Sequence, residues 1–209
     1  MKLVVVSAGL SVPSSTRLLA DRLAAAVKQL APAEVQVVEV RDLAVEIAHH
    51  LTSGFPGRAL AAAQDAVAGA DALIVVTPVF SASYSGLFKS FFDVLDKDAL
   101  AGKPVLVAAT GGSARHSLVL DHALRPLFSY LRAVVVPTGV YAASEDWGAE
   151  GLDGRIERAA GELAALLPEG RPEAEPVTSV TSAKARDRFE VVPFAEQLAA
   201  VSPTGARAV

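Results

Sequence analysis

Short, continuous apolar runs constrain the fold of this chain most strongly. They are rich in valine, and longer stretches with a helical pattern separate them. A run without alternating polar residues is typical of a strand covered on both faces, as in a parallel sheet between layers of helices. The repeated alternation of strand and helix predicts a doubly wound α/β fold. The predicted strands are residues 3–6, 35–40, 72–76, 105–109 and 133–136.

The segments between these strands predict helices on both faces of the sheet. We expect a three-layer sandwich with a five-stranded parallel sheet in the order 2-1-3-4-5, which is the flavodoxin-like order. Residues 49–58 contain two glycines and a proline and are predicted to form a loop. Pro126 falls inside a helical pattern and should kink or bulge that helix. The predicted helices are residues 16–30, 59–68, 84–95, 118–131 and 152–167.

The composition changes near residue 168, which predicts one domain over residues 1–168 and a linker and tail over 169–209. Residues 168–184 are rich in proline, glutamate, serine and threonine, as linkers are. Residues 189–198 are apolar again, and Pro193 could start a short helix there. This apolar segment could pack on its own domain or on a neighbouring subunit, or it could act as a lid or partner contact.

Composition excludes several classes of function. The net charge is −4 without a basic run, so we expect no nucleic-acid partner. The absence of cysteine excludes disulfides, thiolate metal sites and a cysteine nucleophile. The histidines do not show the i, i+4 spacing of a zinc site, and we expect no metal. No stretch is long enough to cross a bilayer, so we expect a cytoplasmic protein.

Three predicted loops follow strands at the edge where open parallel sheets bind ligands. They are residues 7–16, 77–86 and 110–113. The first loop lacks the Gly-x-Gly-x-x-Gly of dinucleotide folds, and the chain lacks the Gly-Lys-Ser/Thr of triphosphate loops. A phospho-receiver domain would need aspartates where Ser7 and Thr77 stand. These common alternatives are therefore excluded.

The first loop is rich in hydroxyl groups and leads directly into a predicted helix. Backbone N–H groups and the helix dipole favour an anion there, and neutral donors beside Arg17 suit a phosphate monoester. The same residues could instead be a helix cap with ordinary turn residues. Arg17 and Arg115 could contact a cofactor phosphate or be solvated surface charges.

The second and third loops offer backbone groups to a planar ring. Pro78 should end its strand, Ser83 could cap the next helix, and Phe80 or Tyr84 could lie beside the ring or belong to the core. The glycines of residues 110–113 permit close approach, and N–H groups there could stabilise negative charge on a flavin. That segment could equally be an ordinary turn. Trp147 could cover a flavin or pack in an interface.

Together these motifs resemble the NAD(P)H-dependent FMN reductases, over about residues 1–143. The resemblance rests on the first loop, on Thr77-Pro78-Val79-Phe80 with its Tyr-Ser-Gly-Leu continuation, and on Thr110-Gly111-Gly112. It is closest to the branch that supplies reduced flavin to two-component monooxygenases, such as those that desulfonate alkanesulfonates. The tail resembles that of an actinobacterial subgroup.

The resemblance implies roles for residues in all three loops. In part of the family a tyrosine occupies a π-bulge at the tetramer interface, and the corresponding position here is His122. No catalytic side chain is expected, because the chemistry belongs to the cofactors. The resemblance implies that Ser11, Ser14, Ser15 and Thr16 hold the FMN phosphate, that Pro78, Val79, Phe80 and Ser81 line the isoalloxazine ring, and that Thr110, Gly111, Gly112 and Ser113 contact its other edge.

The function that the resemblance implies is hydride transfer from NADPH or NADH to FMN. Reduced FMN would then supply a flavin-dependent monooxygenase, and helices 84–95 and 118–131 would build a homodimer or homotetramer. Two alternatives keep the same fold. One is a quinone or azo reductase that retains its flavin, and the other is a flavodoxin-like electron carrier without turnover.

Overall fold

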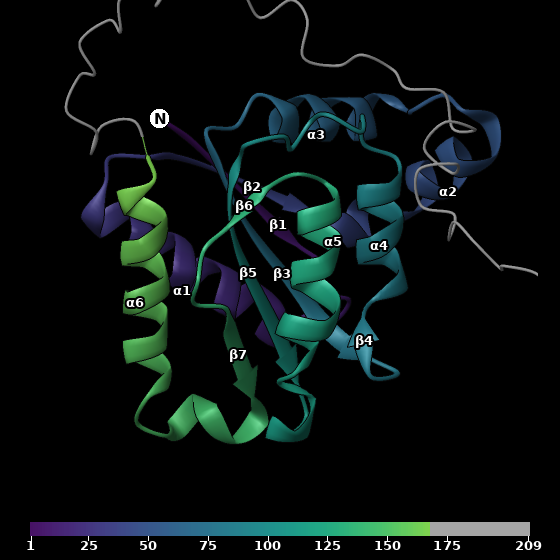
Figure 1. The fold of residues 1–209 in the computed structure, drawn as a ribbon. Coiled ribbons are helices and arrows are strands. Elements are labelled where there is room, and N and C mark those ends of the chain that lie inside the picture. Colours follow the sequence, from purple (N-terminus) through teal and green to yellow (C-terminus); the bar gives the residue numbers. More distant parts are fainter. Residues whose placement is uncertain (168–209) are drawn as a thin grey trace, which may run out of the picture. The chain divides into compact units, whose positions relative to one another are not determined.

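The computed structural model describes residues 1–167, which form a twisted sheet with helices on both faces (Figure 1). The predicted linker and the apolar tail segment lie outside the described residues. The sheet has seven strands. They are β1 (Lys2–Ser7), β2 (Glu34–Glu39), β3 (Ala72–Phe80), β4 (Ser83–Tyr84), β5 (Pro104–Gly111), β6 (Val134–Val135) and β7 (Val140–Ala143).

The strand order β2-β1-β3-β5-β6 confirms the predicted doubly wound class, and every neighbouring pair on this path is parallel. The strand count differs from the prediction in two places. The short β4 pairs antiparallel with β3, and β7 joins β6 as a second parallel partner of β5. The predicted fifth strand, residues 133–136, corresponds to β6, whereas β7 was not predicted; Pro137, which has no backbone N–H, lies between the two strands.

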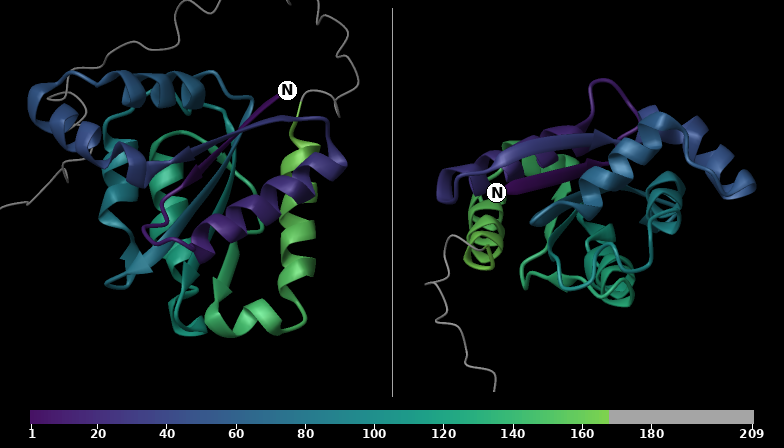
Figure 2. Two further views of the ribbon diagram at one scale, coloured as in Figure 1. Left: turned by 180° about the vertical axis from the view of Figure 1, so that it is seen from behind. Right: turned by 90° about the horizontal axis from the view of Figure 1, so that it is seen from above.

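Helices cover the sheet in two layers (Figure 2). The side chains of the helices at residues 15–30 and 152–165 pack on one face, and those of the helices between residues 44 and 130 pack on the other. The helices are α1 (Ser15–Leu30), α2 (Ala44–Ser53), α3 (Arg58–Ala68), α4 (Gly86–Asp93), α5 (Arg125–Tyr130) and α6 (Leu152–Ala165), with 3₁₀ turns η1 (Val40–Leu43), η2 (Ala114–His116) and η4 (Ser144–Gly148) and a π-helical turn η3 (Leu120–Leu124).

The apolar runs of the sequence form the centre of this sandwich. In β1, Leu3 and Val5 face α1 and α6, whereas Val4 and Val6 face the opposite layer, and all four are buried. Successive side chains of a strand point to opposite faces, so a strand with both faces covered needs an unbroken apolar run. None of the helices within residues 1–167 is both long and apolar enough to span a membrane.

The expected loop at residues 49–58 was wrong in its first half. Helix α2 extends to Ser53 and ends where Gly54 adopts a left-handed conformation, with φ of 79°. Only Ile47 of this helix is buried, although Leu43, Ile47 and Leu51 recur at helical spacing in the sequence. The prediction gave more weight to the glycines and the proline that follow. The glycines and the proline mark the short connection to α3, not the whole segment.

The irregularity expected at Pro126 is confirmed. The π-helical turn η3 immediately precedes α5, and Pro126 occupies the first turn of α5, where a missing N–H has little cost. His122 lies on this π-helical turn and is exposed, whereas Leu120 and Leu124 are buried. The predicted single helix over 118–131 is therefore a π-helical turn, Leu120–Leu124, that leads directly into the α-helix α5.

Two details at the end of β3 correct the sequence interpretation. Pro78 does not end the strand; it lies within it and aligns with Thr110 of β5. Its missing N–H is tolerated because pairing between β1 and β3 stops at Val76, which leaves one side of β3 open. Ser85, not Ser83, caps α4, and its hydroxyl accepts a hydrogen bond from the Phe88 N–H.

Candidate functional site

Three loops meet at the carboxyl ends of β1, β3 and β5 (Figure 1). We call residues 7–16 loop one, residues 77–86 loop two and residues 110–113 loop three. The parallel register aligns Ser7 with Val76 and Pro78 with Thr110, so the strands end at one edge. The buried hydroxyls of Thr16 and Thr110 lie 2.8 Å apart, which joins loop one to loop three.

Loop one presents hydroxyl groups around the start of α1. Ser14 caps this helix by accepting a hydrogen bond of 3.2 Å from the Arg17 N–H, and the Ser11 hydroxyl donates to the Pro13 carbonyl. Ser11 and Ser15 are exposed, so they are accessible to a ligand, whereas Thr16 is buried. A β-carbon at Gly9 would collide with the Ser14 hydroxyl, so the loop folds tightly onto its own cap.

A hollow of about 320 Å³ lies on loop one. Serine hydroxyls and two arginines line it, as the expected phosphate site requires. Two carboxylates line it as well, which the sequence analysis did not anticipate. Its lining residues are Ser11, Val12, Pro13, Ser14, Arg17, Leu18, Asp21, Glu39 and Arg41.

Loop two is a tight hairpin between β3 and β4. Ser81 and Ala82 form its turn with φ of 48° and 68°, a left-handed conformation that costs roughly 1–3 kcal/mol for a residue with a side chain. The buried Thr77 hydroxyl supports the hairpin, because it accepts from the Ser85 N–H and donates to the Pro78 carbonyl, both at 3.0 Å. The turn is thus held in one shape at the edge of the site.

The structure distinguishes the two aromatic side chains of loop two. Tyr84 packs against the core, with its ring centroid 6.0 Å from that of Phe88. Phe80 stays 46% exposed and lies at the end of β3. Of the two aromatics, Phe80 is therefore the one available to a planar ligand, and Pro78 and Val79 next to it are half-buried.

Loop three is anchored by residues that the sequence analysis did not identify. The Tyr141 hydroxyl donates a 2.8 Å hydrogen bond to the Ser113 carbonyl, and Glu145 accepts from the Ala114 N–H at 3.2 Å. A β-carbon at Gly111 would collide with the Tyr141 hydroxyl, so only glycine fits beside it. Burial, with the charges of Glu145 and Asp146, raises the pKa of Tyr141, which keeps this donor protonated.

Residues just after β7 hold the end of this strand, which contains Tyr141, in place. Asp146 accepts hydrogen bonds from the Ala143 N–H at 2.8 Å and from the Arg155 guanidinium at 2.9 Å. A hollow of about 350 Å³ adjoins this corner, and Ala114, Tyr141 and Arg155 are among its lining residues. Strand β7 gave no recognisable signal in the sequence, so its contribution to loop three could not be found there.

The other residues singled out in the sequence differ in where they lie. Trp147 packs against the core layer of α1 and α6, with the Arg22 guanidinium 6.0 Å from its ring centroid. Arg115 and His116 are exposed beside loop three.

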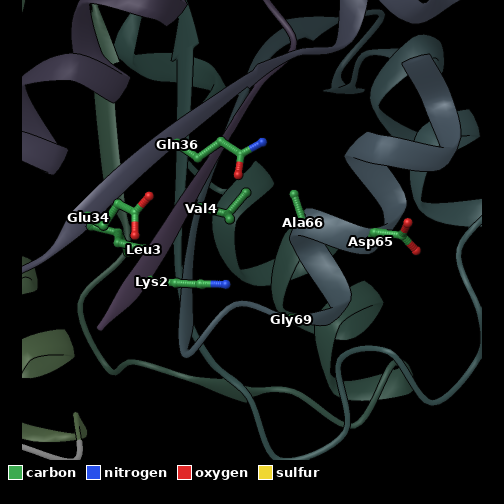
Figure 3. A pocket seen from close by; sticks show the side chains of 8 residues that line it. All are labelled: Lys2, Leu3, Val4, Glu34, Gln36, Asp65, Ala66 and Gly69. Atoms are coloured by element: carbon green, nitrogen blue, oxygen red, sulfur yellow. The ribbon is translucent and has the colours of Figure 1, made fainter. Parts of the chain in front are cut away.

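Another small hollow, lined by Lys2, Glu34 and Asp65 among others, lies at the amino ends of β1 and β2, away from the three loops (Figure 3).

The arrangement suits a phosphorylated, planar ligand. The exposed serines and the free N–H groups of α1 fit a phosphate, and the buried Ser7 hydroxyl at the end of β1 has no partner among the described residues. Gly112 is exposed with open space around it, so the backbone of loop three is accessible to a ring edge. Within residues 1–167 there is no cluster of acidic or histidine side chains that could hold a metal.

The fold and the site define a flavodoxin-like protein with a ligand site at the carboxyl edge of the sheet. An archaeal flavodoxin shares this fold at a TM-score of 0.56 and 16% identity, covering 78% of this chain and 96% of its own. The family model of the NADPH-dependent FMN reductases matches residues 1–148. This chain belongs to that family, which confirms the resemblance seen in its motifs.

The individual relatives agree with the family. The chain is 44% identical to the FMN reductase (NADPH) of Pseudomonas aeruginosa, over 82% of this chain and 95% of the relative. It is 43% identical to the NADH-dependent FMN reductase SfnF of Pseudomonas fluorescens, over 80% of this chain and 92% of the relative. A solved oxidoreductase from Corynebacterium diphtheriae is 52% identical, with a TM-score of 0.78, and the match covers 80% of this chain and 97% of that one.

Proposed function

We infer that this protein is an NAD(P)H-dependent oxidoreductase that reduces FMN. The observation that carries this function is the convergence of loops one, two and three at one sheet edge in a chain of the FMN reductase family. When both are bound, nicotinamide and flavin supply the hydride chemistry themselves. The protein's task is to hold the two rings in contact and to exclude other geometries.

We propose that each loop holds one part of FMN. Ser11, Ser14 and Ser15 and the N–H groups of α1 would bind the phosphate. Pro78, Val79, Phe80 and Ser81 would line one side of the ring, and Gly111, Gly112 and Ser113 would present backbone groups to its other edge. The mutual hydrogen bond of Thr16 and Thr110 supports a different task for these two residues, which is to fix the distance between the loops.

Steady-state NADPH and NADH oxidation in air, with FMN varied, tests this function. A nearly colourless protein whose rate saturates with added FMN is the expected result. A yellow protein that ignores added FMN and reduces quinones or azo compounds would replace FMN reduction with the flavin-retaining alternative. Oxidation that stops after one equivalent of NADPH would leave only an electron carrier.

We propose further that reduced FMN leaves the protein and serves a flavin-dependent monooxygenase in the cytoplasm. We also propose that the protein assembles as a homodimer or homotetramer. Exposed apolar side chains in and before α5 support self-association, since Leu118 is 61% and Tyr130 is 85% exposed. Light scattering at micromolar concentration tests the assembly, and a monomeric mass would contradict it.

A further inference from the structure

The hollow on loop one has balanced charges. Two arginines and two carboxylates line it, namely Arg17, Arg41, Asp21 and Glu39, so their formal charges cancel. This balance is unexpected for a phosphate site, because an FMN phosphate carries close to two negative charges at neutral pH, as other phosphate monoesters do. Hydrogen bonds from a free cation to a phosphate are stronger than those from neutral donors, so unpaired arginines would bind the phosphate more tightly.

Arg17 directly follows the serines and Thr16 of loop one in the sequence, and two of the three nitrogens of its guanidinium donate to carboxylates. Its Nε donates to Asp21 and its Nη1 donates to Glu39, each at 2.7 Å. Glu39 is the last residue of β2, and its side chain is only 16% exposed, so the pair with Arg17 is partly shielded from water. Partly buried pairs are screened less by salt than exposed ones.

Arg41 is engaged in a similar way. Its Nη1 donates to the Ser11 carbonyl at 3.1 Å, and its Nε lies 3.4 Å from an Asp42 carboxylate oxygen. Arg41 therefore supports the loop that presents the hydroxyls, while part of its charge is offset by Asp42. Both arginines that line the hollow thus have carboxylate neighbours.

We propose that Glu39 and Asp21 weaken the binding of the flavin phosphate by neutralising Arg17. FMN would therefore remain a substrate that can dissociate. This inference rests on the proposed binding of FMN at loop one. A phosphate would be attracted to Arg17 but repelled by two fixed carboxylates a few ångströms away. Neutral hydroxyls and helix N–H groups would then carry recognition, and Arg17 would add little charge attraction to it.

The test measures flavin binding, not turnover. FMN and riboflavin are titrated into the full-length wild-type protein and its Glu39→Gln variant at low ionic strength, with flavin fluorescence as the signal. Riboflavin has the same ring but no phosphate, so it isolates the phosphate contribution. Removing one negative charge near the phosphate should tighten FMN binding roughly tenfold, slow FMN dissociation in stopped flow and leave riboflavin unchanged. The gain should shrink at high salt.

Asp93→Asn is the matched control. Asp93 pairs with Lys89 within α4 and does not line the hollow. Asp93→Asn therefore removes one carboxylate from an ion pair, as Glu39→Gln does, and its i, i+4 spacing matches the Arg17–Asp21 pair. It should leave both affinities at wild-type values. Circular dichroism checks that the variants are folded, and Asp21→Asn is the second test of the same charge balance if Glu39→Gln does not fold.

The possible outcomes separate this proposal from the proposed function. FMN affinity in Glu39→Gln that is unchanged or weaker, in a protein that still reduces FMN, would overturn the charge balance and leave the enzyme function intact. Equal tightening of FMN and riboflavin would also overturn it, because the effect would not act through the phosphate. A wild-type protein that binds neither flavin would remove both proposals.

Discussion

The hydroxyl groups of Thr16 at the start of α1 and Thr110 at the end of β5 share a buried hydrogen bond of 2.8 Å. These residues are far apart in the sequence, and the bond holds loops one and three at a fixed separation. Thr16→Val keeps the shape but leaves the Thr110 hydroxyl buried without this partner, which should cost about 1–3 kcal/mol of unfolding free energy. Urea denaturation measures the change.

The double variant Thr16→Val with Thr110→Val provides the control for this pair. Replacing both partners by apolar groups of the same shape removes the unpaired hydroxyl, so the double variant should be more stable than the sum of the single changes predicts. Strictly additive losses would mean that the two hydroxyls do not depend on each other.

Gly111→Ala should destabilise the protein, and Tyr141→Phe should partly rescue it. The new β-carbon would collide with the Tyr141 hydroxyl, and once the hydroxyl is removed the nearest ring atom lies 3.2 Å away, a tight but tolerable contact. Thermal unfolding of the two single variants and the double variant measures the coupling. Gly112→Ala is the matched control, because a β-carbon there meets nothing within 4 Å. A destabilisation of Gly111→Ala that Tyr141→Phe leaves unchanged would contradict this account.

Phe80→Ala should weaken the binding of FMN and riboflavin by similar factors. The side chain is 46% exposed at the end of β3. In the proposed binding mode it contacts the ring and not the phosphate. Stacking of a base on an aromatic side chain contributes about 1–3 kcal/mol in other proteins, and a flavin ring should be similar. Phe55→Ala, at a 74% exposed position after α2, serves as the control and should bind both flavins normally.

Acid should loosen the corner that anchors loop three through Asp146. Burial raises the pKa of this carboxyl, but hydrogen bonds from Ala143 and Arg155 together outweigh it, so the pKa lies below its ordinary value of 3.8. A carboxyl group whose pKa is lowered by folding stabilises the folded state at pH values above its ordinary pKa. This stabilisation is lost as the pH falls through the lower pKa of the folded state.

Asp146→Asn tests this pH dependence. The variant should be less stable than the wild type at neutral pH, and the difference should narrow as the pH falls below 3.8. Urea denaturation at a series of pH values measures it. A difference that stays constant from neutral pH down to pH values well below 3.8 would show that the Asp146 charge is not involved.

The sequence was sufficient to predict the centre of the sheet because β1, β3 and β5 are buried on both faces. The run in β3 from Ala72 to Val76 must be apolar throughout, so it is visible without a structure. Helix α2 was missed for a different reason: Gly54, Pro56 and Gly57 follow it closely, and these turn residues led to the prediction of a loop that included its last residues. Strand β7 was missed because its four residues follow a proline break, which is too short a pattern to recognise.

The candidate site was predictable at the level of loops but not of contacts. Parallel strands end at one edge, so the three loops could be placed together from the strand order alone. The mutual bond of Thr16 and Thr110 and the anchoring of Ser113 by Tyr141 depend on side-chain directions that no spacing reveals. Glu39 did carry a signal, since it ends β2 at the same edge as Ser7.

The π-turn before α5 has a consequence for changes in chain length. A π-turn holds one residue more than the corresponding α-helical turn, and here the exposed His122 lies between the buried Leu120 and Leu124. Deleting His122 should let the segment close into a regular α-helix with both leucines still on one side. By contrast, deleting one residue within β3 would turn every later side chain of that strand to the opposite face of the sheet. Insertions and deletions are therefore expected to accumulate at this turn and to be absent from the neighbouring strands.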